Sequence, residues 1–290
     1  MKKMIALIGL FSLLLTGCTG QKAPAQVAAT TLPVYEFTTR LCEGTGISVT
    51  RLVTESVSCL HDYSLNVKQV RAAEAAQVIV ISGAGLEAFM EDLLNGRSTI
   101  DSSVGIELMH CAHEHEHAHE HTHTHEEDAH IWLSPAAAKV MARNICNGLS
   151  AQYPQNSDAF SANLEALLSD LDALQAYGEE QLSDLTCREI ITFHDGFAYF
   201  ADSFGLTILE AVEEESGSEA SAAELKELIT MVREHSLPAI FTEANGSTSA
   251  AGIISAETGV QIYALDMAMS GDSYFDAMYH NIDIIKEALG

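Results

Sequence analysis

The sequence has few basic residues. Only 14 of its 290 residues are Lys or Arg, against 41 Asp or Glu, so the formal net charge is −27. Proteins that bind nucleic-acid phosphates need clustered Lys and Arg, so this composition argues against a nucleic-acid partner. The excess of carboxylates suits a protein that meets cations or basic surfaces. With 47% hydrophobic residues the chain is long enough for one large or two ordinary globular domains.

Cysteine is scarce and irregularly spaced. Five cysteines follow the N-terminal region, and no two of them form a C-x-x-C pair: Cys42, Cys59, Cys111, Cys146 and Cys187. An odd, scattered set is not a disulfide framework. We expect packed thiols, with a single bridge of unassigned partners as the alternative.

No hydrophobic run of the length that spans a bilayer appears at the N-terminus. Residues 4–15 are apolar, but a membrane-spanning helix needs about 20 residues. Lys2 and Lys3 precede this run and Leu15-Thr16-Gly17-Cys18 follows it, which resembles a bacterial lipoprotein signal with its lipobox. The resemblance predicts a signal peptide at 1–17, lipidation of Cys18 and a tether at 18–25. The protein is then expected on the extracytoplasmic side of the cell membrane, held by a lipid anchor. An ordinary secretory signal is the alternative.

The next part of the chain alternates between strand and helix patterns. Strands are expected at residues 26–31, 48–53 and 77–82, and helices at 34–41, 67–75, 86–94 and 135–149. Ser134 is a suitable N-cap for the last of these helices, with proline at its first position. Strand–helix–strand order predicts a parallel sheet with crossover helices, here forming an N-terminal α/β lobe over residues 26–153.

A long helix is predicted to follow this lobe. Leucines recur at three- and four-residue spacing through residues 156–185, and only Gly178 interrupts the pattern. At 1.5 Å per residue such a helix is about 40 Å long, so we assign residues 154–186 to a rigid linker between two lobes. Residues 187–290 then repeat the α/β order. Strands are expected at 189–193, 206–209, 239–242 and 261–265, and helices at 196–204, 222–235, 247–258 and 274–289.

Four side chains of metal-ligand type lie near predicted strand or helix ends. His61 follows the strand at 48–53, His130 precedes a capped helix, His194 follows the strand at 189–193, and Asp266 follows the strand at 261–265. In open α/β sheets the carboxyl ends of the strands face the binding crevice, so these residues are expected to converge between the lobes. Three imidazoles and one carboxylate form a four-coordinate set suited to zinc.

Several segments resemble the solute-binding lipoproteins of zinc and manganese ABC transporters. They are TTLPVYEF, the loop with His61-Asp62-Tyr63, VIVISGAGLEAFMEDLL, HIWLSP, TFHDGFAYF and ALDMAMSGDSYFDAMYHNIDII. The resemblance covers essentially the whole mature chain. It implies two α/β lobes joined by one long rigid helix, with a metal ion in the interlobe cleft held by His61, His130, His194 and Asp266. It also implies an ABC permease and its ATPase subunit as partners.

The same resemblance bears on metal choice and on individual residues. Histidine at the third ligand position accompanies zinc and glutamate accompanies manganese, so His194 favours Zn²⁺ as the transported ligand, with Mn²⁺ as the alternative. The loop ESVSCLHDY departs from the family, which usually has a proline before the histidine. Glu243 is expected to support the site rather than bind metal, and Asp62 and Asp195 are candidates to orient the imidazoles.

Residues 110–128 form a histidine-rich acidic loop. Its eight histidines are candidates for accessory metal capture, as in family members that take up zinc: His110, His113, His115, His117, His119, His121, His123 and His125. The loop also matches the H-E-x-x-H pattern of zinc proteases through Glu114 and Glu120. That mechanism needs an amphipathic helix, and nothing apolar here would pack one.

We therefore expect a binding protein and not an enzyme. Four protein ligands leave no open position for the water that catalytic zinc activates. The expected function is capture of zinc and its delivery to a permease, by a chain that acts as a monomer. A manganese-specific member of the same family is the nearest alternative. A metal-binding surface adhesin and a zinc hydrolase remain as further alternatives.

Overall fold

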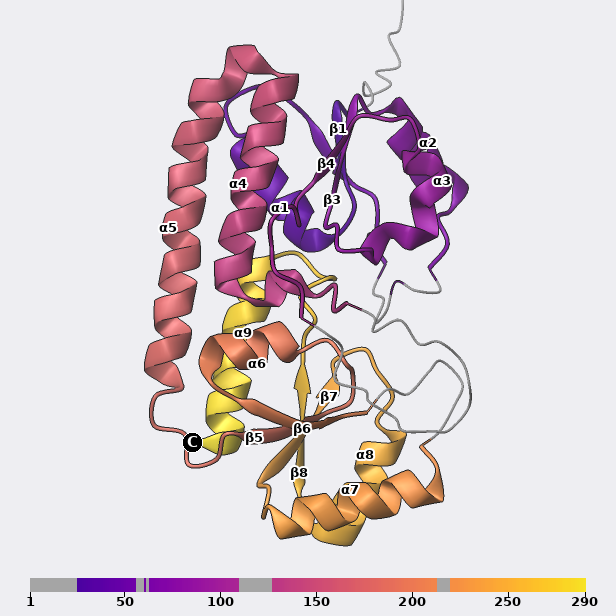
Figure 1. Ribbon diagram of the computed structural model, residues 1–290, viewed down its shortest axis with the longest axis vertical. Coiled ribbons are helices and arrows are strands. Elements are labelled where there is room, and N and C mark those ends of the chain that lie inside the picture. The colour runs from indigo at the N-terminus through magenta and orange to yellow at the C-terminus, as the bar shows by residue number, and fades with distance from the viewer. Residues whose placement is uncertain (1–24, 56–59, 61–62, 110–126, 213–219) are drawn as a thin grey trace, which may run out of the picture.

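The computed structural model describes residues 25–55, 60, 63–109, 127–212 and 220–290. Within these residues the chain forms two halves, each built on a four-stranded sheet of parallel strands. Figure 1 shows the halves stacked along the long axis, with helix α5 running beside both. The predicted α/β class with two lobes is confirmed.

The N-terminal half contains the strands β1 (Val27–Ala29), β2 (Val49–Arg51), β3 (Val78–Ile81) and β4 (Thr99–Asp101), in the order β2-β1-β3-β4. Its helices are α1 (Leu32–Leu41), α2 (Val67–Ala75), α3 (Glu91–Leu94) and α4 (Pro135–Gln152). Side chains alternate across the sheet: Val27 and Val80 join the cluster that includes α1 and α4, while Ala28 and Ile79 join the α2 side. Helices therefore cover both faces of the sheet.

The C-terminal half contains β5 (Glu189–Thr192), β6 (Thr207–Ala211), β7 (Ala239–Glu243) and β8 (Gln261–Leu265), in the order β6-β5-β7-β8. Its helices are α6 (Ala198–Phe204), α7 (Ala222–Glu234), α8 (Ser249–Thr258) and α9 (Tyr274–Leu289). Ile190 and Phe241 pack on the side of α6 and α9, whereas Ile191 and Ile240 pack on the side of α7 and α8. In both sheets the strand order reverses beside the first strand of the half, and such a switch point opens a crevice at the carboxyl ends of the strands.

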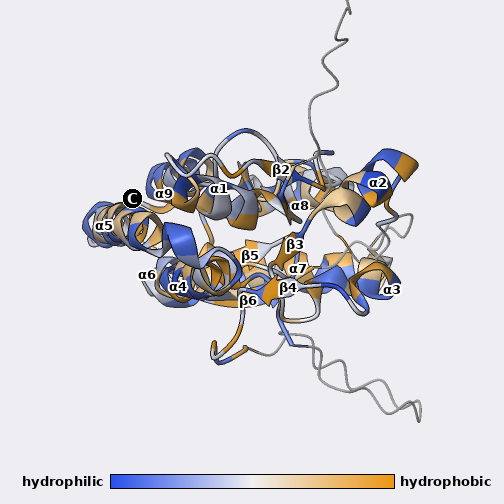
Figure 2. Ribbon diagram, turned by 90° about the horizontal axis from the view of Figure 1, so that it is seen from above, coloured by the Kyte–Doolittle hydropathy of each residue, from blue (hydrophilic) through white to orange (hydrophobic). Residues whose placement is uncertain are grey.

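Helix α5 (Ser157–Gln181) forms most of the predicted linker. A short 3-10 helix, Pro154–Asn156, precedes it, so the α-helix is shorter than the predicted linker of 154–186. Its buried residues follow helical spacing: Phe160, Leu167, Leu171, Leu174 and Gly178. Helix α5 packs on α1 and α4 of the N-terminal half and on α6 and α9 of the C-terminal half. Figure 2 shows that it carries both hydrophilic and hydrophobic residues. One continuous buried cluster includes residues of both halves.

Two local predictions were wrong in detail. The segment expected as one helix at 86–94 is a 3-10 helix, Leu86–Met90, followed by the single turn α3, and Glu87 within the 3-10 helix has non-helical backbone angles. Strand β4 was not predicted, because only Ile100 of its three residues is buried. The expected N-cap of α4 is confirmed, since Ser134 Oγ accepts a hydrogen bond from the Ala137 N–H.

The described cysteines are free thiols. Cys42 and Cys146 are buried and Cys187 is half-buried, and burial raises the pKa of the Cys42 thiol to about 12. This agrees with packed thiols for these three, while Cys59 and Cys111 lie outside the described residues. No described helix is both long enough and apolar enough to cross a membrane. Cys18 and the predicted signal also lie outside the described part.

Two helical glycines give a matched test of how α5 is held against the C-terminal half. A Cβ atom at Gly178 would lie 2.2 Å from Cε1 of Phe204 on α6, whereas a Cβ at Gly252 on α8 would meet no atom within 4 Å. We expect Gly178→Ala to lower the free energy of unfolding by about 1–3 kcal/mol through overpacking. Gly252→Ala should raise it by about 0.5–1 kcal/mol, because alanine favours the helix.

Urea unfolding of both variants measures the two changes. Equal stabilisation by the two substitutions would contradict the close packing of α5 on α6.

Candidate metal centre

Two of the predicted ligands, one from each half, lie side by side. The Nε2 atoms of His130 and His194 are 3.3 Å apart, and their rings meet edge-on with centroids 5.1 Å apart. Both side chains are buried, with 7% and 8% of the residue surface exposed. Two nitrogen ligands of a tetrahedral zinc ion, each about 2.0–2.1 Å from the metal, are about 3.4 Å apart. The spacing of the two imidazoles therefore fits a shared metal ion.

Each histidine is placed by the chain that immediately surrounds it. His194 lies two residues beyond the end of β5, and its carbonyl accepts a hydrogen bond from Thr192 Oγ1 at 3.1 Å. His130 precedes the 3-10 helix Ile131–Leu133, in which Trp132 is fully buried and its Nε1 donates to the Met267 carbonyl at 2.7 Å. Because Met267 belongs to the other half, this bond holds the His130 segment against the C-terminal half.

Gly196 has no side chain, and this leaves room for the imidazole rings of His130 and His194. A Cβ atom at this position would lie 2.7 Å from Cδ2 of His194, 2.9 Å from Cε1 of His130 and 2.7 Å from Cε of Met267. Any larger residue would therefore push on both imidazoles at once.

Asp128 orients His130. Its Oδ1 accepts a hydrogen bond from the His130 backbone N–H and lies 2.8 Å from His130 Nδ1. A carboxylate on Nδ1 fixes the ring and leaves Nε2 free of that proton, which is the usual arrangement around a metal-binding histidine. Asp128 is 1% exposed, and its Oδ2 has no hydrogen-bond partner among the described residues. The sequence pattern placed Asp128 in the histidine-rich loop at 110–128 and did not single it out. Its position two residues before His130 was the available signal.

Glu243 lies beside His194. It ends β7, the neighbour of β5 in the sheet, and its Oε2 is 3.8 Å from His194 Nδ1. Burial, and secondarily the charge of Asp266, raise the pKa of the Glu243 carboxyl to about 7. A supporting role for Glu243 in metal binding stays a prediction.

Asp266 follows β8 directly and is held by its own half. Its backbone N–H donates to Asn281 Oδ1 at 2.8 Å, and its Oδ1 accepts from the Ala268 N–H at 2.7 Å. Within the described ranges, no group of three or more His, Cys, Asp or Glu side chains is arranged to hold a metal ion. The structure thus brings His130 and His194 together but does not add Asp266 to them. His61, Asp62 and the histidines at 110–125 lie outside the described residues.

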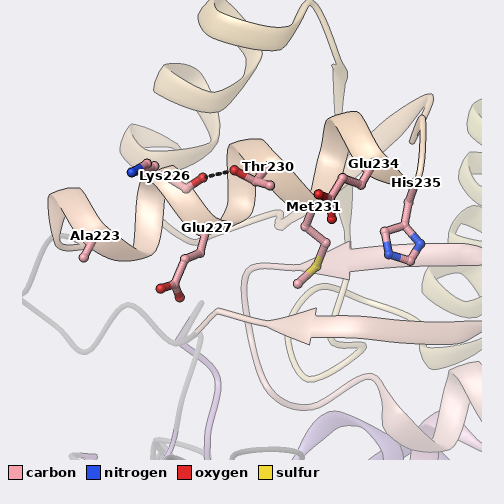
Figure 3. A pocket seen from close by; sticks show the side chains of 7 residues that line it. All are labelled: Ala223, Lys226, Glu227, Thr230, Met231, Glu234 and His235. Carbon is pink, nitrogen blue, oxygen red and sulfur yellow. Dashed lines mark hydrogen bonds between the residues drawn. The ribbon is translucent and has the colours of Figure 1, made fainter.

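A surface pocket of about 420 Å³ lies elsewhere, along α7. Figure 3 shows its lining, in which the Thr230 hydroxyl donates to the Lys226 carbonyl. The lining residues are Ala223, Lys226, Glu227, Thr230, Met231, Glu234 and His235, none of which is a predicted ligand.

Comparisons with known proteins agree with this architecture. Residues 27–288 match the family described as zinc-uptake complex component A, periplasmic. The chain is 30% identical to the zinc-binding lipoprotein AdcA of Streptococcus pneumoniae, in a match that covers 99% of this chain and 61% of AdcA. It is also 30% identical to the high-affinity zinc uptake system protein ZnuA of Bacillus subtilis, over 91% of this chain and 87% of that protein.

A manganese-binding relative and a solved structure match as well. The manganese ABC transporter substrate-binding lipoprotein PsaA of S. pneumoniae is 25% identical over 100% of this chain and 99% of its own length. A crystal structure of ZnuA superposes with a TM-score of 0.78 at 29% identity, covering 92% of this chain and 100% of that one. The chain spans about three fifths of the length of AdcA. From the family match over residues 27–288 and the shared two-lobed fold, the chain belongs to the ZnuA family.

Proposed function

We propose that this protein is the extracytoplasmic solute-binding component of a zinc ABC importer. It would capture Zn²⁺ between its two halves through His61, His130, His194 and Asp266 and deliver the ion to a membrane permease that works with an ATPase subunit. The observation that carries the proposal is the 3.3 Å separation of His130 Nε2 and His194 Nε2, from different halves of the molecule.

The donor set supports zinc over manganese. Imidazole nitrogen suits zinc, whereas manganese is better matched by carboxylate, carbonyl and water oxygens. Two relatives that are 30% identical are named for zinc, and the relative named for manganese is 25% identical. The position of His194 in the pair therefore favours zinc as the ion carried.

The remaining parts of the proposal concern delivery. Four protein ligands close the coordination shell, which suits binding and release and not activation of water. Ligands from both halves would let the metal favour one small rearrangement of the halves, which the permease could recognise. Lipidation of Cys18 would hold the protein at the outer face of the cell membrane, and the histidines at 110–125 would collect zinc as accessory ligands.

The first prediction is one tight zinc equivalent that depends on His194. The test protein is the mature chain with residues 110–126 replaced by a short linker, so that Asp128 is kept. We expect His194→Ala to weaken zinc binding at least about 100-fold, since a nitrogen ligand is lost. His280→Ala, at an exposed position on α9, should leave the affinity unchanged.

Metal stoichiometry and competition titration of zinc against manganese provide the measurement. If the test protein, which lacks residues 110–126, has no tight zinc site, the assignment of four ligands is refuted. Tighter binding of manganese than of zinc would keep the architecture and refute the choice of metal.

A second prediction concerns the carboxylate on His130. Asp128→Ala should weaken zinc binding about 10–100-fold, the usual effect of removing an outer partner of a ligating histidine. Asp128→Asn should weaken it less, because the amide oxygen can still accept from Nδ1–H. Competition with a chelator measures both values, with Asp172→Ala, which removes an exposed ion pair with Lys139, as the control. An affinity unchanged in Asp128→Ala would show that the hydrogen bond does not serve the metal.

A third prediction concerns pH. Histidine binds zinc only as neutral imidazole, and free imidazole takes up a proton near pH 6.5. The zinc affinity of the test protein should therefore be constant above about pH 7.5 and fall steadily as the pH drops below about 6.5. Titrations between pH 5.5 and 8 measure this dependence, and an affinity that stays flat over the range would argue against histidine ligands.

A further inference from the structure

The segment that follows Asp266 is attached to the opposite half of the molecule. In chain order residues 266–273 belong to the C-terminal half, between β8 and α9, and Tyr274 begins α9. Arg51, the last residue of β2, donates from Nη1 to the Gly271 carbonyl at 2.9 Å, and Trp132 Nε1 donates to the Met267 carbonyl at 2.7 Å. Two donors of the N-terminal half thus hold backbone atoms of this segment.

The start of α9 is held from the same side. Glu36 on α1 accepts the Tyr274 backbone N–H at Oε2, at 2.6 Å, and thus binds an N–H that has no partner within the helix. Tyr274 is fully buried, its ring lies edge-on to Phe37 with centroids 5.1 Å apart, and its hydroxyl donates to the Trp132 carbonyl at 2.8 Å. Residues 267–274 are therefore bounded at both ends by contacts with the N-terminal half.

Hydrogen bonds link Asp266 to α9 and to Ala268, which belong to or follow the segment that these contacts hold. Asn281 on α9 is fully buried. Its Oδ1 accepts from the Asp266 N–H at 2.8 Å, and its Nδ2 donates to the Asp266 carbonyl at 2.7 Å. The carboxylate itself accepts from the Ala268 N–H, and Ala268 has a positive φ of 54°, a conformation rare for a residue with a side chain. A shift of residues 268–274 would therefore move both the backbone and the carboxylate of Asp266.

We propose that Arg51 and Glu36 are positioning residues for Asp266, which they set from the opposite half through residues 267–274. The inference rests on the proposed function, in which Asp266 is a zinc ligand. Arg51 is well placed for this role because its guanidinium also lies 5.9 Å from the centre of the Tyr35 ring on α1, which fixes its direction. In this arrangement the Asp266 carboxylate follows movements of the N-terminal half, although its strand belongs to the C-terminal sheet.

A double-mutant cycle on the full mature chain tests the proposal. The variants are Arg51→Ala, Asp266→Ala and the two combined, and the readout is the dissociation rate of zinc into an excess of chelator. We expect Arg51→Ala to raise this rate about fivefold to tenfold, as for loss of one hydrogen bond. In the Asp266→Ala background the same substitution should change the rate less than about twofold, because the group that it positions is gone.

Conservative variants and a matched control keep the test independent of stability. Arg51→Lys retains a donor and should recover most of the wild-type rate, and Glu36→Gln retains an acceptor and should be milder than Glu36→Ala. Arg97 also donates to backbone carbonyls, those of Ala73 and Glu74, but within the N-terminal half. Arg97→Ala should leave the zinc dissociation rate unchanged even where it lowers the unfolding midpoint.

The outcomes separate this inference from the proposed function. An equal effect of Arg51→Ala with and without Asp266 would overturn the positioning role while leaving zinc binding intact. An unchanged rate in Asp266→Ala would refute Asp266 as a ligand and the positioning role with it, yet the His130–His194 pair would stand. Failure of the wild-type chain to bind zinc would overturn both.

Discussion

The packing of the two halves against each other is the constraint on which the candidate metal centre depends, because it brings His130 and His194 together. Two neutral imidazoles that face each other through Nε2 at 3.3 Å repel unless a proton or a cation lies between their lone pairs. Asp128 Oδ1, 2.8 Å from His130 Nδ1, favours a proton on that nitrogen and so leaves the Nε2 lone pair facing His194. The arrangement persists because the two halves are held together by their packing, which keeps the pair ready for a cation.

The surrounding charges favour the same outcome. Glu243 is buried beside His194, and its pKa is raised by burial and by the charge of Asp266. Asp128 is buried with one carboxylate oxygen that has no hydrogen-bond partner among the described residues. Buried carboxylates without a nearby cation are costly, so a divalent ion at the histidine pair would offset part of this cost.

The interface between the halves is extensive, which limits how far they can move. One buried cluster contains residues of both halves, and α5 packs on helices of each. Trp132, Glu36 and Arg51 add hydrogen bonds from the N-terminal half to residues 267–274. A metal ion at the histidine pair would therefore bind between halves that already pack against each other.

The sequence alone determined most of the helices and strands, and the family. The hydrophobic periods of α2, α9 and β8 predicted their bounds, and the spacing of leucines predicted a long helix, because these patterns depend on neighbours a few residues apart. The position of His194 just beyond β5 was also predicted from the sequence, because the apolar run at 189–193 ends directly before it. The same reasoning failed for β4 and for the helix expected at 86–94, where tertiary contacts override weak local preferences.

The tertiary structure decided where the side chains around the predicted ligands lie. The position of Glu243 beside His194 and the contacts of Arg51 and Glu36 with residues 267–274 join segments as far as 238 positions apart. No local period encodes such contacts, since they depend on how two sheets and α5 pack together. The sequence thus determined which residues could bind a metal, and the packing of the two halves decided that His130 and His194 meet.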